Sequence, residues 1–356
     1  MIATESSGER IPAMKYYPWF DWLRLALACV VMLSHEGLIQ AWPQAGDFAV
    51  QIFFALSGWL IGGILLTLPR NELSRFYFNR ALRIWCPYFL ALALFIAASL
   101  LRDPVTLKWR EFVFYKVTFV YNLFGPRQLA EHKSEMPLAG TGNHFWSVNA
   151  EEQFYLLAPL FLVLVPKRYG RSVITWIIIA GLTWFSHIYA SIAFGVLAAV
   201  VGDAYGAFHK HYLVRILAGA VVVGSAIGFI AGVDYDLLAP ICAIAVVLLL
   251  AINGNQHSVG ALAGGMSYPL YLNAWIPVFI VNFVFKRAGL VNPFARHVLV
   301  VTLNLALAAF LYWHIDRRLH VTRRRLYTPG RARVVSMVAY GTVAAGVFFA
   351  LFLYAR

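Results

Sequence analysis

The stretch from Phe20 to Ile39 limits the fold most, because it is an apolar run of membrane length that carries an arginine and a histidine. Ionisable side chains at that depth are costly, and they usually mark function. Arg24 and His35 would lie within about 20° of each other on a helix, about 16 Å apart along its axis. Two interpretations stay open. Either Arg24 snorkels to one membrane surface while His35 caps the far end, or both face a functional site.

The composition excludes a soluble globular domain, because 61% of the residues are hydrophobic and only 13% are charged. The net charge of +13 does not indicate a nucleic-acid partner. Lys and Arg gather in short loops between apolar runs, which is typical of membrane orientation and contact with membrane lipids. The three cysteines, Cys29, Cys86 and Cys242, show no metal-ligand spacing, so we expect neither a metal site nor a disulfide framework.

The distribution of arginines predicts the topology. The loop that holds Arg70, Arg75, Arg80 and Arg83 is expected in the cytoplasm, together with the N-terminus. The run from Phe112 to Phe124 is short and contains a lysine, so we expect it to be interfacial or re-entrant.

This choice keeps Lys167–Arg171 and the later arginine-rich loop in the cytoplasm, and it puts Gly125–Asn149 outside. The sequence therefore predicts an all-α polytopic membrane protein, a bundle of about 10–11 transmembrane helices plus the short re-entrant or interfacial segment. The turn between 188 and 190 is the least defined boundary. The expected spans lie near 20–39, 48–68, 84–101, 151–165, 173–188, 190–206, 212–232, 236–252, 268–285, 296–315 and 334–354.

Small residues mark the second span. Ser57, Gly58, Gly62 and Gly63 would let either a neighbouring helix or a ligand approach the backbone closely. Close packing alone is sufficient to explain them.

Two arginines one helical turn apart, Arg80 and Arg83, stand where the third span begins. Neighbouring guanidinium groups can hold one phosphorylated ligand, although membrane orientation alone also requires arginines in such a loop.

The segment HFWSVNAEEQFY enters the fourth span. Asn149 and Glu152 have the spacing of an N-cap residue and its N3 partner, which would explain Glu152 structurally. Helix capping does not explain Glu151. Beside His144 and Trp146 it could orient an imidazole or bind a sugar hydroxyl, whereas the aromatic residues could equally form an interfacial belt. The later segment SYPLYLNAW, from Ser267 to Trp275, is unremarkable alone, because Pro and Tyr are ordinary at a helix start near an interface.

Taken together, these segments resemble the membrane-bound acyltransferase-3 family, which O-acetylates surface polysaccharides, lipopolysaccharide and related acceptors. The resemblance covers most of the chain, and the motifs occur in the family's order. The matching positions are Arg24 and His35; Phe53 to Gly58; Arg80 and Arg83; Trp146, Ser147, Glu151, Phe154 and Tyr155; and Ser267, Tyr268, Tyr271 and Leu272.

The chain departs from the family pattern at three places. Gln51 stands where many members have Asp, Ala274 where many have His, and Asp316-Arg317-Arg318 where Glu-Lys-Pro or Glu-Arg-Pro is usual. These departures affect the acceptor and the outer half of the site, and they leave Arg24 and His35 in place.

The resemblance implies one integral-membrane acyltransferase domain over residues 1–356 in a bacterial inner membrane. Its expected parts are a loose cytoplasmic N-terminus (1–17), a catalytic core (18–315), an arginine-rich cytoplasmic loop (316–333) and an extra C-terminal span (334–356). The chain ends just after this last span, so we expect no fused soluble domain.

The resemblance also implies a donor, cytoplasmic acetyl-CoA, and an acceptor, a glycan or lipid-linked glycan at the outer side. Arg80, Arg83, Arg24 and Ser57 are expected to bind the donor. His35 would act as general base or as acyl carrier, with Glu151 or Glu36 orienting its ring. The residues expected to bind the acceptor are Trp146, Ser147, Asn143, Tyr155, Tyr268 and Tyr271.

Two alternatives remain on the sequence. A proton-coupled transporter would also place Arg and His inside a membrane, although no inverted repeat of broken segments is evident. O-acylation of a small secondary metabolite is the second alternative.

Overall fold

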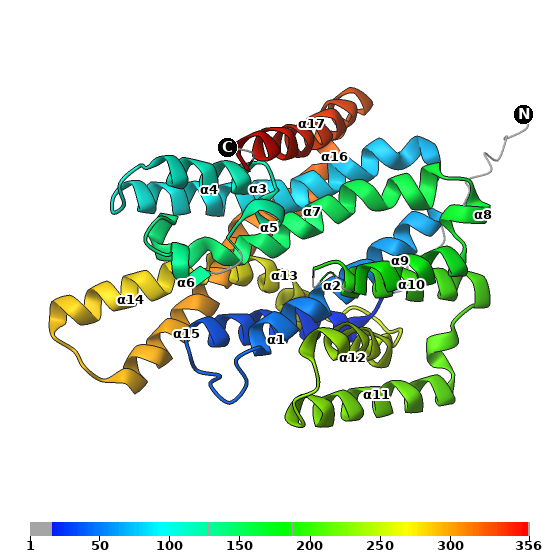
Figure 1. Ribbon diagram of the computed structural model, residues 1–356, viewed down its shortest axis with the longest axis horizontal. Helices are drawn as coiled ribbons and strands as arrows, with labels where there is room; N and C mark the ends of the chain where they lie inside the picture. Colours follow the sequence, from blue (N-terminus) through cyan, green and yellow to red (C-terminus); the bar gives the residue numbers. More distant parts are fainter. Residues whose placement is uncertain (1–15, 127–128, 185, 187, 355–356) are drawn as a thin grey trace, which may run out of the picture.

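The computed structural model describes residues 16–126, 129–184, 186 and 188–354. Within these ranges the chain forms helices and no strand, so the predicted all-α class is confirmed (Figure 1). The main helices are α1 (Pro18–His35), α2 (Ala45–Thr67), α3 (Leu73–Leu100), α4 (Leu107–Val117), α5 (Tyr121–Phe124), α6 (Leu129–His132), α7 (Phe145–Pro159), α8 (Lys167–Gly170), α9 (Val173–Trp184), α10 (Ala190–Tyr205), α11 (Tyr212–Ile230), α12 (Tyr235–Leu250), α13 (Ser258–Asn273), α14 (Trp275–Ala288), α15 (Pro293–Leu311), α16 (Arg317–Leu326) and α17 (Pro329–Tyr354).

Helix α2 is the central helix of the bundle, and it packs against α1, α7, α10 and α12. Within its most apolar window, 72% of the residues are buried. Its contact with α10 is close enough for the backbones to touch. A Cβ atom added to Gly58 would lie 2.2 Å from the Ile192 carbonyl oxygen, and one added to Gly195 would lie 2.2 Å from that of Ala55. Packing against α10 therefore explains Gly58, while Ser57 points elsewhere.

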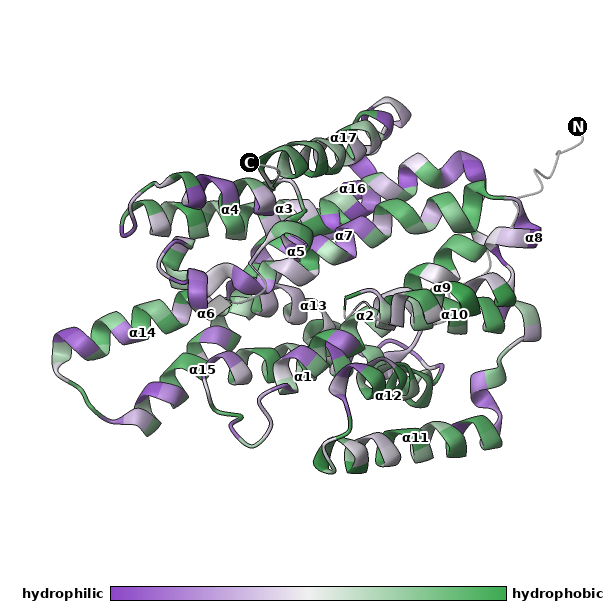
Figure 2. Cartoon of the chain, in the orientation of Figure 1, coloured by the Kyte–Doolittle hydropathy of each residue, from purple (hydrophilic) through white to green (hydrophobic). Residues whose placement is uncertain are grey.

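The outer helices expose their apolar side chains instead of burying them. Only 11% of the α11 window and 17% of the α17 window are buried. Figure 2 shows both helices coloured mostly as hydrophobic, whereas α16 is mostly hydrophilic. Apolar side chains over whole exposed helices suit contact with lipid rather than water. The chain is a multi-pass membrane protein.

By length and hydropathy, five of the described helices are able to cross a membrane, or six if one bent pair counts as a single span. The other predicted spans fall on shorter or less apolar helices, among them α1, α7, α9, α10 and α12. The expected number of 10–11 spans therefore stays a prediction. Near the uncertain turn, α10 begins at Ala190, and residue 187 lies outside the described residues, as do 1–15 of the expected N-terminal segment.

The expected span at 268–285 is wrong as a single helix. Helices α13 and α14 meet at Ala274 with a bend of 59°. Pro277 supplies the reason, because a proline ring clashes with the carbonyl four residues earlier, and that position is Asn273, the last residue of α13.

Helix α1 confirms that Arg24 and His35 belong to one helix, but it ends at His35 rather than Ile39. Gly37 has φ +69°, a left-handed conformation that commonly ends helices.

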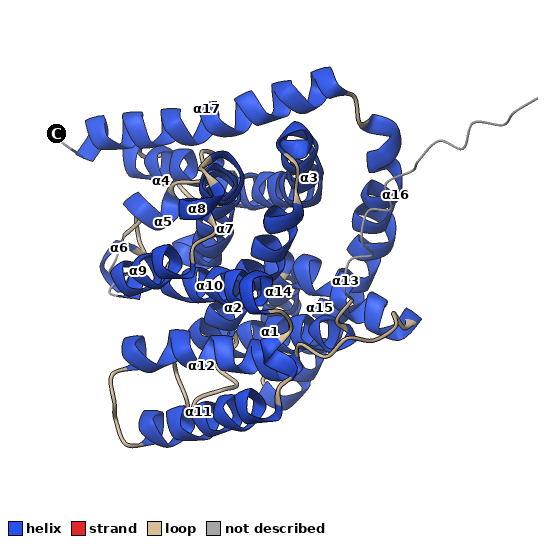
Figure 3. Cartoon of the chain, turned by 90° about the vertical axis from the view of Figure 1, so that its right-hand side faces the viewer, coloured by secondary structure: helices blue, strands red, loops and turns tan. Residues whose placement is uncertain are grey.

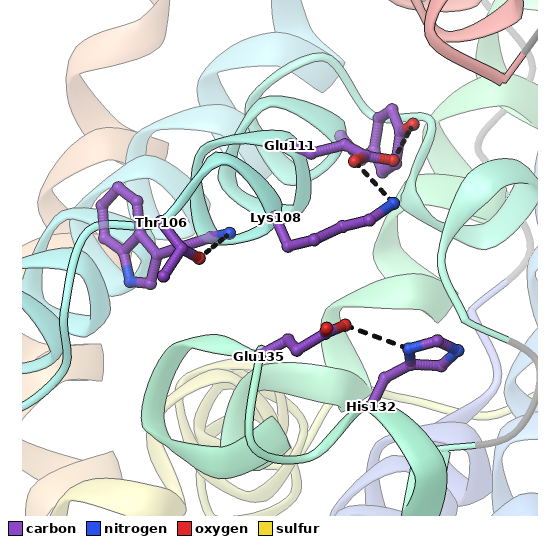
Figure 4. Close-up of polar contacts among 7 residues, drawn as sticks. Thr106, Lys108, Glu111, His132 and Glu135 are labelled. Atoms are coloured by element: carbon purple, nitrogen blue, oxygen red, sulfur yellow. Dashed lines mark hydrogen bonds and ion pairs between the residues drawn. The ribbon is translucent and has the colours of Figure 1, made fainter. Parts of the chain in front are cut away.

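The segment expected to lie outside is in large part folded into the protein. Residues Pro137–His144 form 3-10 turns that pack against α3, and Leu138, Gly140 and His144 are buried. Nearby, Thr106 caps α4, and the ion pairs Lys108–Glu111 and His132–Glu135 lie at 2.9 and 3.2 Å (Figure 4). Helix α4 is not among the span-length apolar helices, and its interfacial placement stays a prediction.

The predicted N-cap at Asn149 is wrong, because α7 begins four residues earlier at Phe145. Asn149 is a fully buried interior residue whose amide accepts a hydrogen bond from the Tyr121 backbone N–H at 3.1 Å and donates to the Tyr88 hydroxyl at 2.9 Å. Glu152 is buried as well, and it accepts a hydrogen bond from Trp85 at 2.8 Å. Packing between helices, rather than helix capping, explains both side chains.

Candidate functional site

A cavity of about 300 Å³ lies between α1, α2, α3, α7 and α13. It is the place where the five segments of the sequence resemblance come together. The predicted site residues that line it are Arg24, Ser57, Arg80, Arg83, Ser147, Glu151, Tyr155, Tyr268 and Tyr271.

One side of the cavity is strongly basic. Arg24 forms a 3.1 Å salt bridge with Asp21. The Arg80 guanidinium lies 5.4 Å from the centre of the Tyr155 ring, at cation–π distance, and Arg83 is exposed at the cavity edge. Three arginines against two carboxylates, Asp21 and Glu151, leave the lining with a net positive charge that suits an anionic ligand.

Glu151 lies on the wall of the same cavity and accepts two hydrogen bonds. One comes from the Ser57 hydroxyl at 2.5 Å, and the other comes from the Tyr155 hydroxyl. The carboxylate therefore links α2 to α7, and it lies within the electrostatic range of Arg80. The Glu151 carboxylate thus stabilises this part of the cavity wall and fixes the position of the Ser57 hydroxyl.

Hydrogen bonds connect the cavity wall to a histidine behind it. The Ser147 and Tyr271 hydroxyls are 2.5 Å apart, and Tyr271 donates to the backbone carbonyl of His144 at 3.0 Å. The buried His144 ring packs edge-on against Tyr271 at 5.6 Å between centres. Tyr268, one turn earlier, donates to the Ile84 carbonyl at 3.2 Å instead.

His35 does not line this cavity. It is the last residue of α1, its side chain is exposed, and its ring centre lies 6.2 Å from that of His144. The contacts from Tyr271 through His144 therefore connect the cavity wall to His35. The two imidazoles come from positions 109 residues apart in the chain.

The structure gives His35 different neighbours from those expected. Glu36 pairs with Arg296 at 3.1 Å, and Glu151 binds the two hydroxyls on the cavity wall. Among the described residues, neither carboxylate is hydrogen-bonded to the His35 ring. The expectation that one of them orients this ring is therefore not met here, since each is held by a partner from another helix.

Two further expected residues lie outside the cavity lining. The Trp146 ring packs edge-on against Phe54 at 5.8 Å. The Asn143 side chain accepts a hydrogen bond from the Tyr121 hydroxyl at 2.8 Å. Both contribute contacts to the structure around the cavity.

Sequence reasoning missed three residues as members of the site: Tyr16, Asp21 and His144. Tyr16 and Asp21 line the cavity and are hydrogen-bonded to each other. Burial raises the pKa of Tyr16 to about 12, and its hydrogen bond to Asp21 adds to the effect. The signal for Asp21 was present, because an acidic residue three positions before Arg24 lies on the same helix face.

No group of three or more His, Cys, Asp or Glu side chains in the described part of the chain could hold a metal ion. The ligands that this cavity offers are guanidinium, hydroxyl and carboxylate groups.

Fold and site together define an integral membrane protein whose helices enclose a basic cavity. Hydrogen bonds link this cavity to the His144 backbone, and the His144 ring lies near the His35 ring. The model of the acyltransferase-3 family, described as an acyltransferase domain, matches residues 17–313. The chain belongs to this family. The resemblance found in the sequence is therefore confirmed.

Similarity to curated proteins covers about half of the chain. The chain is 30% identical over 185 residues to the peptidoglycan O-acetyltransferase OatA of Listeria monocytogenes, which covers 51% of this chain and 29% of that protein. It is also 30% identical over 188 residues to a protein provisionally named an O-acetyltransferase from Staphylococcus aureus strain COL, covering 48% and 30%. An uncharacterised Haemophilus influenzae protein is 31% identical over 137 residues, covering 36% and 54%. The match thus spans less than a third of the first two relatives. No solved structure matches the chain.

Proposed function

We propose that this protein transfers an acetyl group from acetyl-CoA to a hydroxyl group of a cell-surface glycan. The observation that carries the proposal is the cavity in which Arg24, Arg80 and Arg83 gather, together with the contacts that join its wall to His144 and His35. Membership of the acyltransferase-3 family supports the reaction class.

The donor half of the proposal rests on charge. Acetyl-CoA carries phosphate groups, and arginines are suited to hold them because the guanidinium group offers several donors in a fixed plane. In the proposed arrangement Arg83 and Arg80 meet the diphosphate at the cavity edge, and Arg24 guides the pantetheine arm inward. The narrow arm has neutral amides, for which Ser57 and the tyrosine hydroxyls are suitable partners.

The chemical step needs a base for the acceptor hydroxyl. A neutral imidazole at His35 takes the hydroxyl proton while the hydroxyl oxygen attacks the thioester carbonyl carbon. The new C–O bond forms as the C–S bond breaks, and the CoA thiolate takes up the proton from the imidazole. In the alternative order, the acetyl group passes first to the His35 ring and then to the acceptor.

The acceptor half of the proposal rests on two observations: His35 is exposed at the end of α1, and a similar protein is named for its polysaccharide substrate. The named substrate of the listerial relative is peptidoglycan. For this chain we propose a glycan, as an exopolysaccharide, an O-antigen or a lipid-linked precursor, at the outer side of the inner membrane. The N-terminus then lies in the cytoplasm, where the donor is available. A small secondary metabolite is the alternative acceptor.

The test measures release of free CoA from acetyl-CoA by the purified protein in liposomes, with and without a surface-glycan extract. We expect release that rises with the extract and that falls at least about 100-fold in His35→Ala, the size typical of a lost general base. His257→Ala is the matched control, since His257 is exposed in the loop before α13. Normal turnover in His35→Ala would refute the role of His35. No release and no CoA binding by the native protein would instead favour the transporter interpretation.

A further inference from the structure

A cluster of cationic side chains lies where α16 packs against α3, next to the cavity. The Tyr327 ring, just after α16, lies 5.6 Å from the Phe78 ring of α3 and carries the Arg75 guanidinium at 5.3 Å. Figure 3 shows α16 running beside α3. These contacts hold α16 against the start of α3, close in sequence to Arg80 and Arg83 of the cavity lining.

The charges that the two helices bring together are close enough to interact electrostatically. Arg83 lies within the electrostatic range of His320 and Arg323, and Arg323 lies within that of Arg75 and Arg324. We refer to these five residues, Arg75, Arg83, His320, Arg323 and Arg324, as the α3–α16 basic cluster. It contains at least four permanent positive charges.

Few carboxylates compensate this charge. Glu72 pairs with Arg75 at 3.4 Å, and Asp316 lies within electrostatic range of Arg83 but beyond salt-bridge distance. No carboxylate among the described residues forms a salt bridge with Arg83, Arg323 or Arg324. Like charges held together without partners destabilise a fold, so the cluster is expected to bind an anion.

The positive-inside rule explains why α16 carries arginines, but it does not explain where on the helix they lie. The same helix carries Arg317 and Arg318, which lie together in a separate surface depression with Trp313. The Arg317 guanidinium packs over the Trp313 ring at 4.4 Å. These two residues would serve the positive-inside rule equally well. The placement of Arg323 within the electrostatic range of Arg83 therefore needs another reason.

The position of Arg83 indicates which anion fits. Arg83 lines the cavity and also belongs to the basic cluster, so a ligand held there can have one end in each. CoA has that form, because a nucleotide with a diphosphate and a 3′-phosphate is joined to a narrow neutral arm. We propose that Arg323 and Arg324 bind the 3′-phosphate of the CoA nucleotide while its arm enters the cavity. This inference rests on the proposed function, in which acetyl-CoA enters by Arg83.

The basic cluster extends past the end of the family match. The family match ends at residue 313, whereas His320, Arg323 and Arg324 follow it.

The test compares binding of CoA and 3′-dephospho-CoA to the purified full-length protein in nanodiscs. The native protein is expected to bind CoA at least about 10-fold more tightly than it binds 3′-dephospho-CoA. The double variant Arg323→Gln/Arg324→Gln should lose that preference and bind dephospho-CoA as the native protein does. The double variant Arg317→Gln/Arg318→Gln is the matched control, with the same loss of charge on the same helix, and it should keep the preference. Retained binding of dephospho-CoA also shows that a variant is folded.

Each other outcome overturns the inference in a distinguishable way. If the native protein binds both nucleotides equally, the 3′-phosphate has no site, although the proposed function stands. If both double variants weaken CoA binding alike, the loss comes from the lower positive charge of α16 as a whole and not from a site at Arg323 and Arg324. If the Arg323/Arg324 variant changes only the association with phosphatidylglycerol vesicles, the cluster holds lipid headgroups. Failure to bind either nucleotide refutes the proposed function itself.

Discussion

At the residue scale, Tyr271 is the side chain that joins the cavity wall to the histidines. In Tyr271→Phe the His144 carbonyl and the Ser147 hydroxyl lose a partner. Loss of a buried hydrogen bond costs about 1–3 kcal/mol. We therefore expect a lower unfolding temperature and, because His144 and His35 lose their fixed arrangement, a drop in CoA release of about 10-fold.

Tyr340→Phe is a suitable control for this experiment. Its hydroxyl donates to the Leu156 carbonyl at 2.7 Å, and Tyr340 does not line the cavity. The control should lower stability by a comparable amount and leave turnover nearly unchanged. Equal losses of turnover in both variants would contradict a special role for Tyr271.

Glu151 allows a second experiment at this scale. Glu151→Gln keeps an acceptor for the hydroxyls of Ser57 and Tyr155, whereas Glu151→Ala removes it. We expect thermal unfolding to show Ala less stable than Gln by about 1–3 kcal/mol, with turnover following stability. If Glu151→Gln instead stops CoA release as completely as His35→Ala while remaining folded, the carboxylate acts in the chemistry.

At the scale of elements, the contact between α2 and α10 holds the centre of the bundle. Gly58→Ala would place a methyl group 2.2 Å from the Ile192 carbonyl oxygen, so the two helices must separate. We expect poor recovery of folded protein from membranes. Gly63→Ala, on the same helix with no atom within 4 Å of the new methyl group, should be recovered normally. Normal recovery of Gly58→Ala would mean that this close approach is not required.

At the scale of the whole molecule, the predicted topology can be tested by thiol labelling. In a background with Cys29, Cys86 and Cys242 changed to Ser, Val291→Cys lies in the exposed α14–α15 connection and Asn255→Cys in the exposed α12–α13 connection. The positive-inside rule places the first outside and the second in the cytoplasm. A reagent that cannot cross membranes should therefore label only Val291→Cys in spheroplasts. The reverse pattern would invert the orientation and remove the cytoplasmic access of the donor.

Several features could be predicted from the sequence because they depend on local chemistry. Residues within one helix have fixed relative positions, so Arg24 and His35 could be assigned to one helix, and Arg80 and Arg83 to one turn. The all-α membrane class followed from apolar runs of membrane length, since the backbone must satisfy its own hydrogen bonds in lipid. Family membership followed from short motifs in a fixed order, and the family match over residues 17–313 agrees with it.

Other features were decided only by the tertiary structure. Ser57 meets Glu151 across 94 residues of sequence, and His144 approaches His35 from a buried turn that had been expected outside. The interior place of Asn149 likewise depends on contacts with Tyr121 and with Tyr88 of α3. Sequence periodicity fixes what happens within a helix, whereas the pairing of distant side chains depends on how all the helices pack. By itself the sequence determined the class and the family, because both depend on apolar runs and on short motifs in a fixed order. Helix packing decided which of the expected residues line the cavity and which partners they have.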